Sequence, residues 1–214
     1  MATMAWLRKD PPGPASTGAP RDRVRAALAA PLAPLVEPMT AVRSGEWAAP
    51  LGDGLTALLT LTALKGRSYD LTYAVCCAWV PVATGSARWP RTLKQAQRHL
   101  WVDHFTIDAP ERPRIITIDG DRALRRTAER TARHVLANAP AWWATVATPT
   151  GVLAEAQRQA GSGRRARSAG PRGRGYTLAR LGRPEKARAA LAEAVLPPDR
   201  AQHLARLDEL LAQQ

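Results

Sequence analysis

The segment Leu55–Val80 constrains the fold most, because it contains two runs of residues that alternate as β-strands do. In the second run, Tyr69–Val80, large apolar residues occupy every second position and small or polar residues lie between them. This period of two is typical of a strand with one buried face. In the first run, Leu55–Lys65, threonines share one face opposite leucines and alanines. Gly66 tolerates a positive φ, so the sequence predicts a β-hairpin.

A two-stranded hairpin is not stable alone in water, so further strands and a layer of helices are expected. Additional strands are predicted at Ser44–Ala49, Val102–Ile107 and Arg114–Ile118. Helices are predicted from Asp22 as the N-cap towards Val36, at Leu93–Trp101, at Arg122–Ala137, from Pro140, and from Pro149 through Gln159. Prolines 31 and 34 are expected to distort or shorten the first helix. The expected class is α+β, a mostly antiparallel sheet with helices on one side plus a C-terminal helical hairpin.

Changes in composition divide the 214 residues into four parts. Residues 1–20 are expected to form a flexible leader, because 10–20 contain four prolines and two glycines. Residues 21–160 form the predicted α+β domain. Residues 161–174 are rich in arginine and glycine and contain no acidic residue, which is typical of a linker. Residues 175–214 are predicted to be a helical tail.

The sequence indicates a cytoplasmic protein without a membrane anchor. Met1–Lys9 lacks the basic start and apolar core of a signal peptide, and no apolar run reaches the roughly 18 residues that span a bilayer. Cys76 and Cys77 are adjacent on the predicted strand, so their side chains point to opposite faces and cannot pair with each other. Two packed, reduced cysteines are typical of a cytosolic protein.

The tail resembles a single tetratricopeptide repeat. The matching small and apolar residues are Gly175, Leu178, Gly182, Ala187, Leu191 and Ala194. The segment Leu181–Ala187 matches the turn between the two helices of that repeat, although Pro171 stands where the family usually has an aromatic residue. A lone repeat cannot bury its own face. The resemblance therefore leaves open a helical pair packed on the main domain or a module that binds a protein partner.

Arginines gather before and within the tail. Eight arginines and no acidic residue lie between Ala156 and Pro184. The candidate nucleic-acid contacts are Arg164, Arg165, Arg167, Arg172 and Arg174. Flexible arginine-rich segments bind phosphate backbones, and the net charge of +13 favours polyanions in general. A solvated linker is the alternative, because only Tyr176 is at hand to stack on bases.

Two aspartates precede the predicted helix Arg122–Ala137. Asp119 and Asp121 are weak candidates for a divalent metal site, since acidic pairs at strand ends hold metals in phosphotransfer enzymes. The same two residues suit a helix start, one as the N-cap and one in the first turn. A helix would bring His99 and Asp103 to one face and leave His104 elsewhere, and His134 would be needed as a third ligand. This cluster is more typical of a surface patch than of a zinc site.

No cofactor or catalytic residue is predicted from motifs, because the chain has no phosphate loop, dinucleotide fingerprint or nucleophile elbow.

Several short motifs resemble a bacterial family known only as a domain of unknown function. They are Tyr73-Ala74-Val75, Trp79-Val80-Pro81, Arg91–Ala96 and Leu100-Trp101, and the resemblance extends over residues 20–160. In that family a strand ending in an aromatic-Val-Pro sequence precedes an Arg-Thr-Leu-Lys helix start. The resemblance implies an α+β domain and assigns no activity.

Three functions remain open from the sequence. The first is a non-enzymatic protein that acts through contacts of its tail with an unknown protein partner. The second is binding of nucleic acid or another polyanion through Arg158–Arg183. The third is a metal-dependent hydrolase or transferase that uses Asp119 and Asp121.

Overall fold

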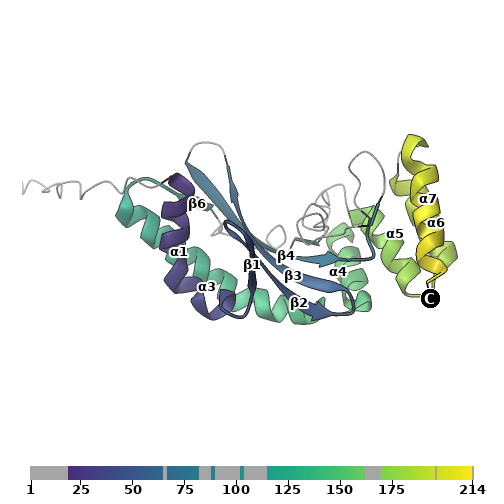
Figure 1. The fold of residues 1–214 in the computed structure, drawn as a ribbon, viewed down its shortest axis with the longest axis horizontal. Coiled ribbons are helices and arrows are strands. Elements are labelled where there is room, and N and C mark those ends of the chain that lie inside the picture. The colour runs from purple at the N-terminus through teal and green to yellow at the C-terminus, as the bar shows by residue number, and fades with distance from the viewer. Residues whose placement is uncertain are drawn as a thin grey trace, which may run out of the picture.

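The protein has the α+β architecture expected from its sequence: an antiparallel sheet with helices on one side and a helical hairpin at the C-terminus (Figure 1). The computed structural model describes residues 19–64, 67–81, 88–89, 102–103, 115–161, 170–195 and 197–213. Most of the predicted leader, the predicted helix at 93–101 and most of the predicted strand 102–107 lie outside these residues.

The sheet is built around the predicted hairpin. Its strands are β1 (Thr40–Arg43), β2 (Glu46–Gly52), β3 (Leu55–Ala63), β4 (Ser68–Cys77), β5 (Val102–Asp103) and β6 (Ile115–Thr117). The strands follow the order β1-β2-β3-β4-β5, and β6 also pairs with β4. The β3–β4 ladder runs without interruption from the pair Leu55–Cys77 to the pair Ala63–Tyr69, which confirms the hairpin. Strand β1 was not predicted, because its four residues are mostly exposed and lack an apolar face.

Helices α1 (Pro20–Val36) and α3 (Asp121–Thr145) pack together on one face of the sheet. Helix α4 (Pro149–Gly161) follows α3 in the chain. Val24, Leu28 and Leu32 of α1 join the large core formed by the sheet, α3 and the tail. The Trp143 indole N–H of α3 donates to the backbone carbonyl of Ala74 on β4 at 2.9 Å. This bond fixes the C-terminal half of α3 against the central strand.

The expected effects of proline on these helices were wrong. Helix α1 continues through Pro31 and Pro34, and α3 continues through Pro140 to Thr145. Pro34 and Pro140 are exposed, so water can satisfy the carbonyls that lose a partner, while the buried side of each helix stays packed. The expected N-cap Asp22 was also wrong, since α1 begins at Pro20, which suits the first turn because its missing N–H is not needed there.

The tail is a bundle of three helices at one end of the sheet (Figure 1). They are α5 (Gly170–Arg180), α6 (Pro184–Ala194) and α7 (Pro197–Leu211). Helices α5 and α6 form the expected hairpin, and Gly182 in the turn has φ +67°. The Trp79 indole N–H, just beyond β4, donates to the Thr177 hydroxyl of α5 at 3.1 Å. The tail is therefore joined to the main core through a buried polar contact as well as through apolar packing.

The boundary predicted between linker and tail needs correction. Residues 170–174 were expected in the linker, and the structure places them in α5. Gly173 and Gly175 are buried, so glycine here allows close helix packing and does not indicate a flexible segment. A Cβ atom at Gly175 would lie 2.7 Å from Cγ of Leu191 on α6.

The two cysteines lie on opposite faces of β4, as expected. Cys77 belongs to the large core, and Cys76 packs on the other face with Ala48 and Leu58. Neither cysteine forms a disulfide, and both are buried. Within the described residues, no helix combines the length and the apolar character needed to cross a lipid bilayer.

The close approach of Gly175 to Leu191 leads to a first prediction. Gly175→Ala is expected to destabilise the protein by about 1–3 kcal/mol, because the added methyl overpacks the α5–α6 interface. Leu191→Ala leaves a cavity and is expected to cost about 2–5 kcal/mol alone. The double variant should be destabilised by less than the sum, since the smaller side chain at position 191 makes room for the methyl at position 175. Urea unfolding of the four proteins measures this, and strict additivity would contradict the predicted packing.

Candidate polyanion-binding site

The exposed face of helix α3 carries the densest set of cationic side chains on a described helix. Its members are Arg122, Arg125, Arg126, Arg130 and Arg133, all exposed. At 100° per residue they lie within an arc of roughly 140°, and they extend over roughly 16 Å of the helix axis. We call this set the α3 arginine face. Glu129 is the acidic residue within it.

The opposite side of α3 explains why these arginines point outward. Leu124, Ala128, Ala132 and Val135 are buried in the core and recur at helical spacing. Arginine at the remaining positions keeps its charged head in water at no cost in core packing. The face is therefore presented by a helix that is held against α1 and the sheet along its length.

The α3 arginine face is also short of local counter-charge. None of its five guanidinium groups forms an ion pair with another described residue. Other arginines of the fold are engaged: Arg23 pairs with Asp121 at 2.7 Å, and Arg188 pairs with Asp208 at 2.6 Å. The unpaired guanidinium groups remain available to an external anion.

The five arginines proposed from sequence as nucleic-acid contacts do not form such a face on the described residues. Arg164, Arg165 and Arg167 lie outside the described residues. Arg174 is exposed on α5. Arg172 is half-buried, its Nε atom is out of contact with solvent, and it lowers the pKa of His203. The structure thus describes only Arg174 of this set as fully available to a ligand.

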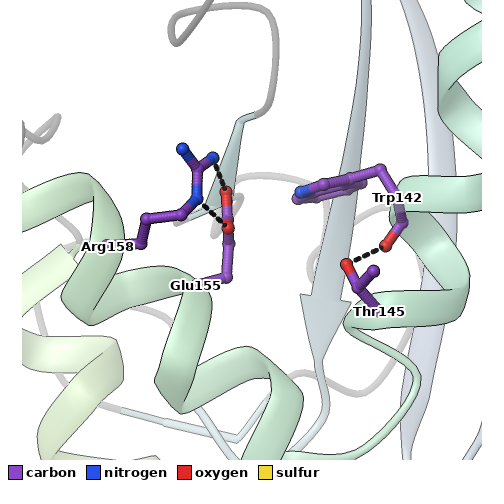
Figure 2. A network of polar contacts seen from close by, with 4 residues as sticks. All are labelled: Trp142, Thr145, Glu155 and Arg158. Carbon is purple, nitrogen blue, oxygen red and sulfur yellow. Dashed lines mark hydrogen bonds and ion pairs between the residues drawn. The ribbon is translucent and has the colours of Figure 1, made fainter.

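Arg158, at the start of the arginine-rich segment, is held by a buried carboxylate. Its Nε and one terminal nitrogen donate to the two oxygens of Glu155, at 2.7 and 2.8 Å (Figure 2). Figure 2 shows the Trp142 indole on the side of Glu155, where α3 and α4 approach each other. Thr145 closes the end of α3 by donating to the Trp142 carbonyl at 2.7 Å. This bidentate pair lies within α4 and leaves Arg158 with little capacity for phosphate.

The weak metal candidates Asp119 and Asp121 are not brought together with further ligands. No group of three or more His, Cys, Asp or Glu side chains suited to a metal occurs in the described part of the chain. Gly120 with φ +101° occupies the N-cap of α3, so the expected cap at Asp119 was wrong. Asp121 lies in the first turn, where a negative charge is favourable, and pairs with Arg23 of α1. Its described role is to join two helices.

The histidine–acid cluster is only partly described. His99 and His104 lie outside the described residues, as does the side chain of Asp103. His134 lies on α3 beside Asn138, and burial lowers its pKa.

Cys76 is poorly suited to nucleophilic chemistry, because burial raises the pKa of its thiol to about 12.

A buried polar cluster holds α7 against α5. The Tyr176 hydroxyl lies 2.7 Å from Nδ1 of His203 and 3.0 Å from the His203 carbonyl. Burial raises the pKa of Tyr176 and lowers that of His203, so both groups stay neutral near pH 7. These groups are sealed between helices, and we assign them a structural role.

Two hollows in the described part of the structure have a distinct lining. The larger, about 530 Å³, lies between α1 and Trp47 and is mostly apolar. The smaller, about 280 Å³, lies between the end of the sheet and the tail and combines apolar and charged walls.

No protein family, curated protein or solved structure matches this chain. The resemblance to a bacterial domain of unknown function and the tetratricopeptide-like character of the tail therefore stay predictions.

The ion pair between Arg23 and Asp121 gives a second prediction. Asp121→Asn is expected to lower the free energy of unfolding by up to about 1 kcal/mol, because the pair is partly exposed. Asp119→Asn is the matched control and should leave stability unchanged. Urea unfolding at low salt measures both. A Mg²⁺-dependent rise in Tm that both substitutions abolish would contradict the structural role and support a metal site.

The His203 environment gives a third prediction. Its pKa in the folded protein lies below the ordinary 6.5, so the unfolded chain binds a proton more readily. Stability from neutral His203 is therefore complete above about pH 6.5 and is lost as the pH falls below it. His203→Gln should flatten the dependence of Tm on pH between about 5 and 7. An unchanged pH profile in this variant would contradict the assignment.

Proposed function

We propose that this protein binds nucleic acid through the phosphate backbone, using the α3 arginine face. The observation that carries the proposal is the set of five exposed guanidinium groups on one helix face, none paired with another described residue. Guanidinium groups bind phosphate oxygens through paired, charge-assisted hydrogen bonds. A rigid helix also loses little conformational entropy when it binds, in contrast to a flexible arginine-rich loop.

The length of the α3 arginine face supports binding to the phosphate backbone of a duplex. Duplex DNA carries one negative charge for about every 1.7 Å of axis, so roughly 16 Å of helix faces several phosphates. An α-helix also fits within the major groove, which is about 12 Å wide. Arginine contacts of this kind position a protein on the duplex without selecting a base sequence. We therefore propose binding with little sequence preference.

Protein contacts through the tail remain the other proposal, and no described feature strengthens it. The exposed large hydrophobic residue among the described ones is Leu64, which follows β3 and does not belong to the tail. A partner surface on the described tail would therefore have to be polar. We also propose that the protein is cytoplasmic, as expected from its two reduced cysteines.

The proposal predicts a steep dependence of DNA affinity on salt. Fluorescence anisotropy with a short labelled duplex, repeated across a salt series, gives log K against log[salt]. The triple variant R126Q/R130Q/R133Q should bind more weakly, and its slope should be shallower by about 0.9 for each phosphate that the variant no longer neutralises. These three residues are exposed, so circular dichroism and Tm should remain those of the original protein.

Two controls make this experiment specific. Arg183→Gln removes an exposed arginine from the turn of the tail and should leave the salt slope unchanged. Glu129→Gln removes the acidic residue from the face and should strengthen binding. If deletion of residues 162–169 abolishes binding while the triple variant binds normally, the arginine-rich segment and not the α3 arginine face binds the DNA. Weak, salt-independent binding by the original protein would overturn the proposal.

A further inference from the structure

The smaller hollow has the composition of a site for a small amphiphilic molecule. It lies where the β2–β3 turn and the residues after β4 meet α5 and α7. Figure 1 shows the tail helices at this end of the sheet. Ligand sites occur preferentially at such junctions between packed units. Its volume of about 280 Å³ suits a molecule of the size of a single amino acid.

Two tryptophans give the hollow an apolar interior. Trp79 and Trp89 both line it, and Leu210 of α7 adds an aliphatic wall. The Trp79 indole N–H is bonded to Thr177, and that of Trp89 donates to Glu209 at 3.0 Å. Because both indole donors are engaged by the protein, the two rings offer the hollow their apolar carbon surfaces. Such surfaces favour a planar, apolar group in the ligand.

Two side chains of opposite charge also line the hollow. Asp53 in the β2–β3 turn and Arg180 at the end of α5 line the hollow, and both are exposed. Neither side chain forms an ion pair with a described residue. Asp53 has φ +50° and lies between Gly52 and Gly54, which also have positive φ. Aspartate tolerates this left-handed conformation, which tight hairpin turns require, so Asp53 adopts it in this turn without unusual strain.

We infer that this hollow binds a free α-amino acid with an aromatic side chain. The ring would lie against Trp79 and Trp89, the ammonium group would pair with Asp53, and the carboxylate would pair with Arg180. A ligand with one charge pairs with only one of these two side chains, and an uncharged ring pairs with neither. A zwitterion with an apolar body matches both charged side chains and the two indole rings. This site is independent of the α3 arginine face.

The experiment compares L-phenylalanine with two capped analogues. N-acetyl-L-phenylalanine lacks the ammonium charge and L-phenylalaninamide lacks the carboxylate. Titrations followed by the indole N–H signals in NMR spectra give the affinity, and Trp89→Phe identifies the Trp89 signal. L-phenylalanine should shift the signals of Trp79 and Trp89, and each analogue should bind at least about tenfold more weakly, the loss expected for one charge-assisted hydrogen bond.

Two charge variants connect each end of the ligand to one protein group. Asp53→Asn should weaken L-phenylalanine binding and leave N-acetyl-L-phenylalanine unaffected, and asparagine tolerates the positive φ of residue 53, so the turn should persist. Arg180→Gln should weaken L-phenylalanine binding and leave L-phenylalaninamide unaffected. Arg183→Gln, close in sequence but outside the hollow, is the control. Equal affinities for all three ligands, or no shift at roughly 10 mM L-phenylalanine, far above a useful dissociation constant, would overturn the inference.

Discussion

The pairing of β3 with β4 is the interaction on which the rest of the structure depends. Nine consecutive residue pairs fix the register from Leu55–Cys77 to Ala63–Tyr69. A shift of one residue would turn every apolar side chain of β4 to the wrong face. That register also decides where Trp79 emerges beyond β4, and hence where the tail is joined through Thr177. The ladder therefore positions the helical layer and the tail together.

Local patterns in the sequence were sufficient for the elements with a clear apolar period, although β4 is buried on both faces and not on one as expected. Alternation in Tyr69–Val80 predicted β4, and the apolar stripe of Leu124 and Val135 predicted most of α3. The helix ends near the prolines were predicted wrongly, because the tendency of proline to end a helix is local, whereas packing against the core keeps these helices continuous. Pro140 removes one hydrogen bond on the exposed side, while Trp142 and Trp143 stay packed on the buried side. Gly173, which is buried in α5, was likewise mistaken for part of a flexible linker.

The candidate sites were harder to predict because they depend on which arginines remain unpaired. The sequence drew attention to residues 158–183, where arginine is most frequent, yet Arg158 pairs with Glu155 and Arg172 is half-buried. The α3 arginines were visible as the polar side of a helix, and their lack of partners is a property of the folded chain. The small hollow joins residues from five separate segments, so no local pattern could indicate it.

Adjacent cysteines on opposite faces of β4 give this protein two internal reporters of local opening. Cys77 lies in the core beneath the helical layer, Cys76 packs on the opposite face with Ala48 and Leu58, and both residues are nearly inaccessible to solvent. A thiol reagent can reach each sulfur only during transient opening of its own side, so the labelling rate follows the free energy of that opening. Two neighbouring residues thus report separately on opening at the two faces of one strand.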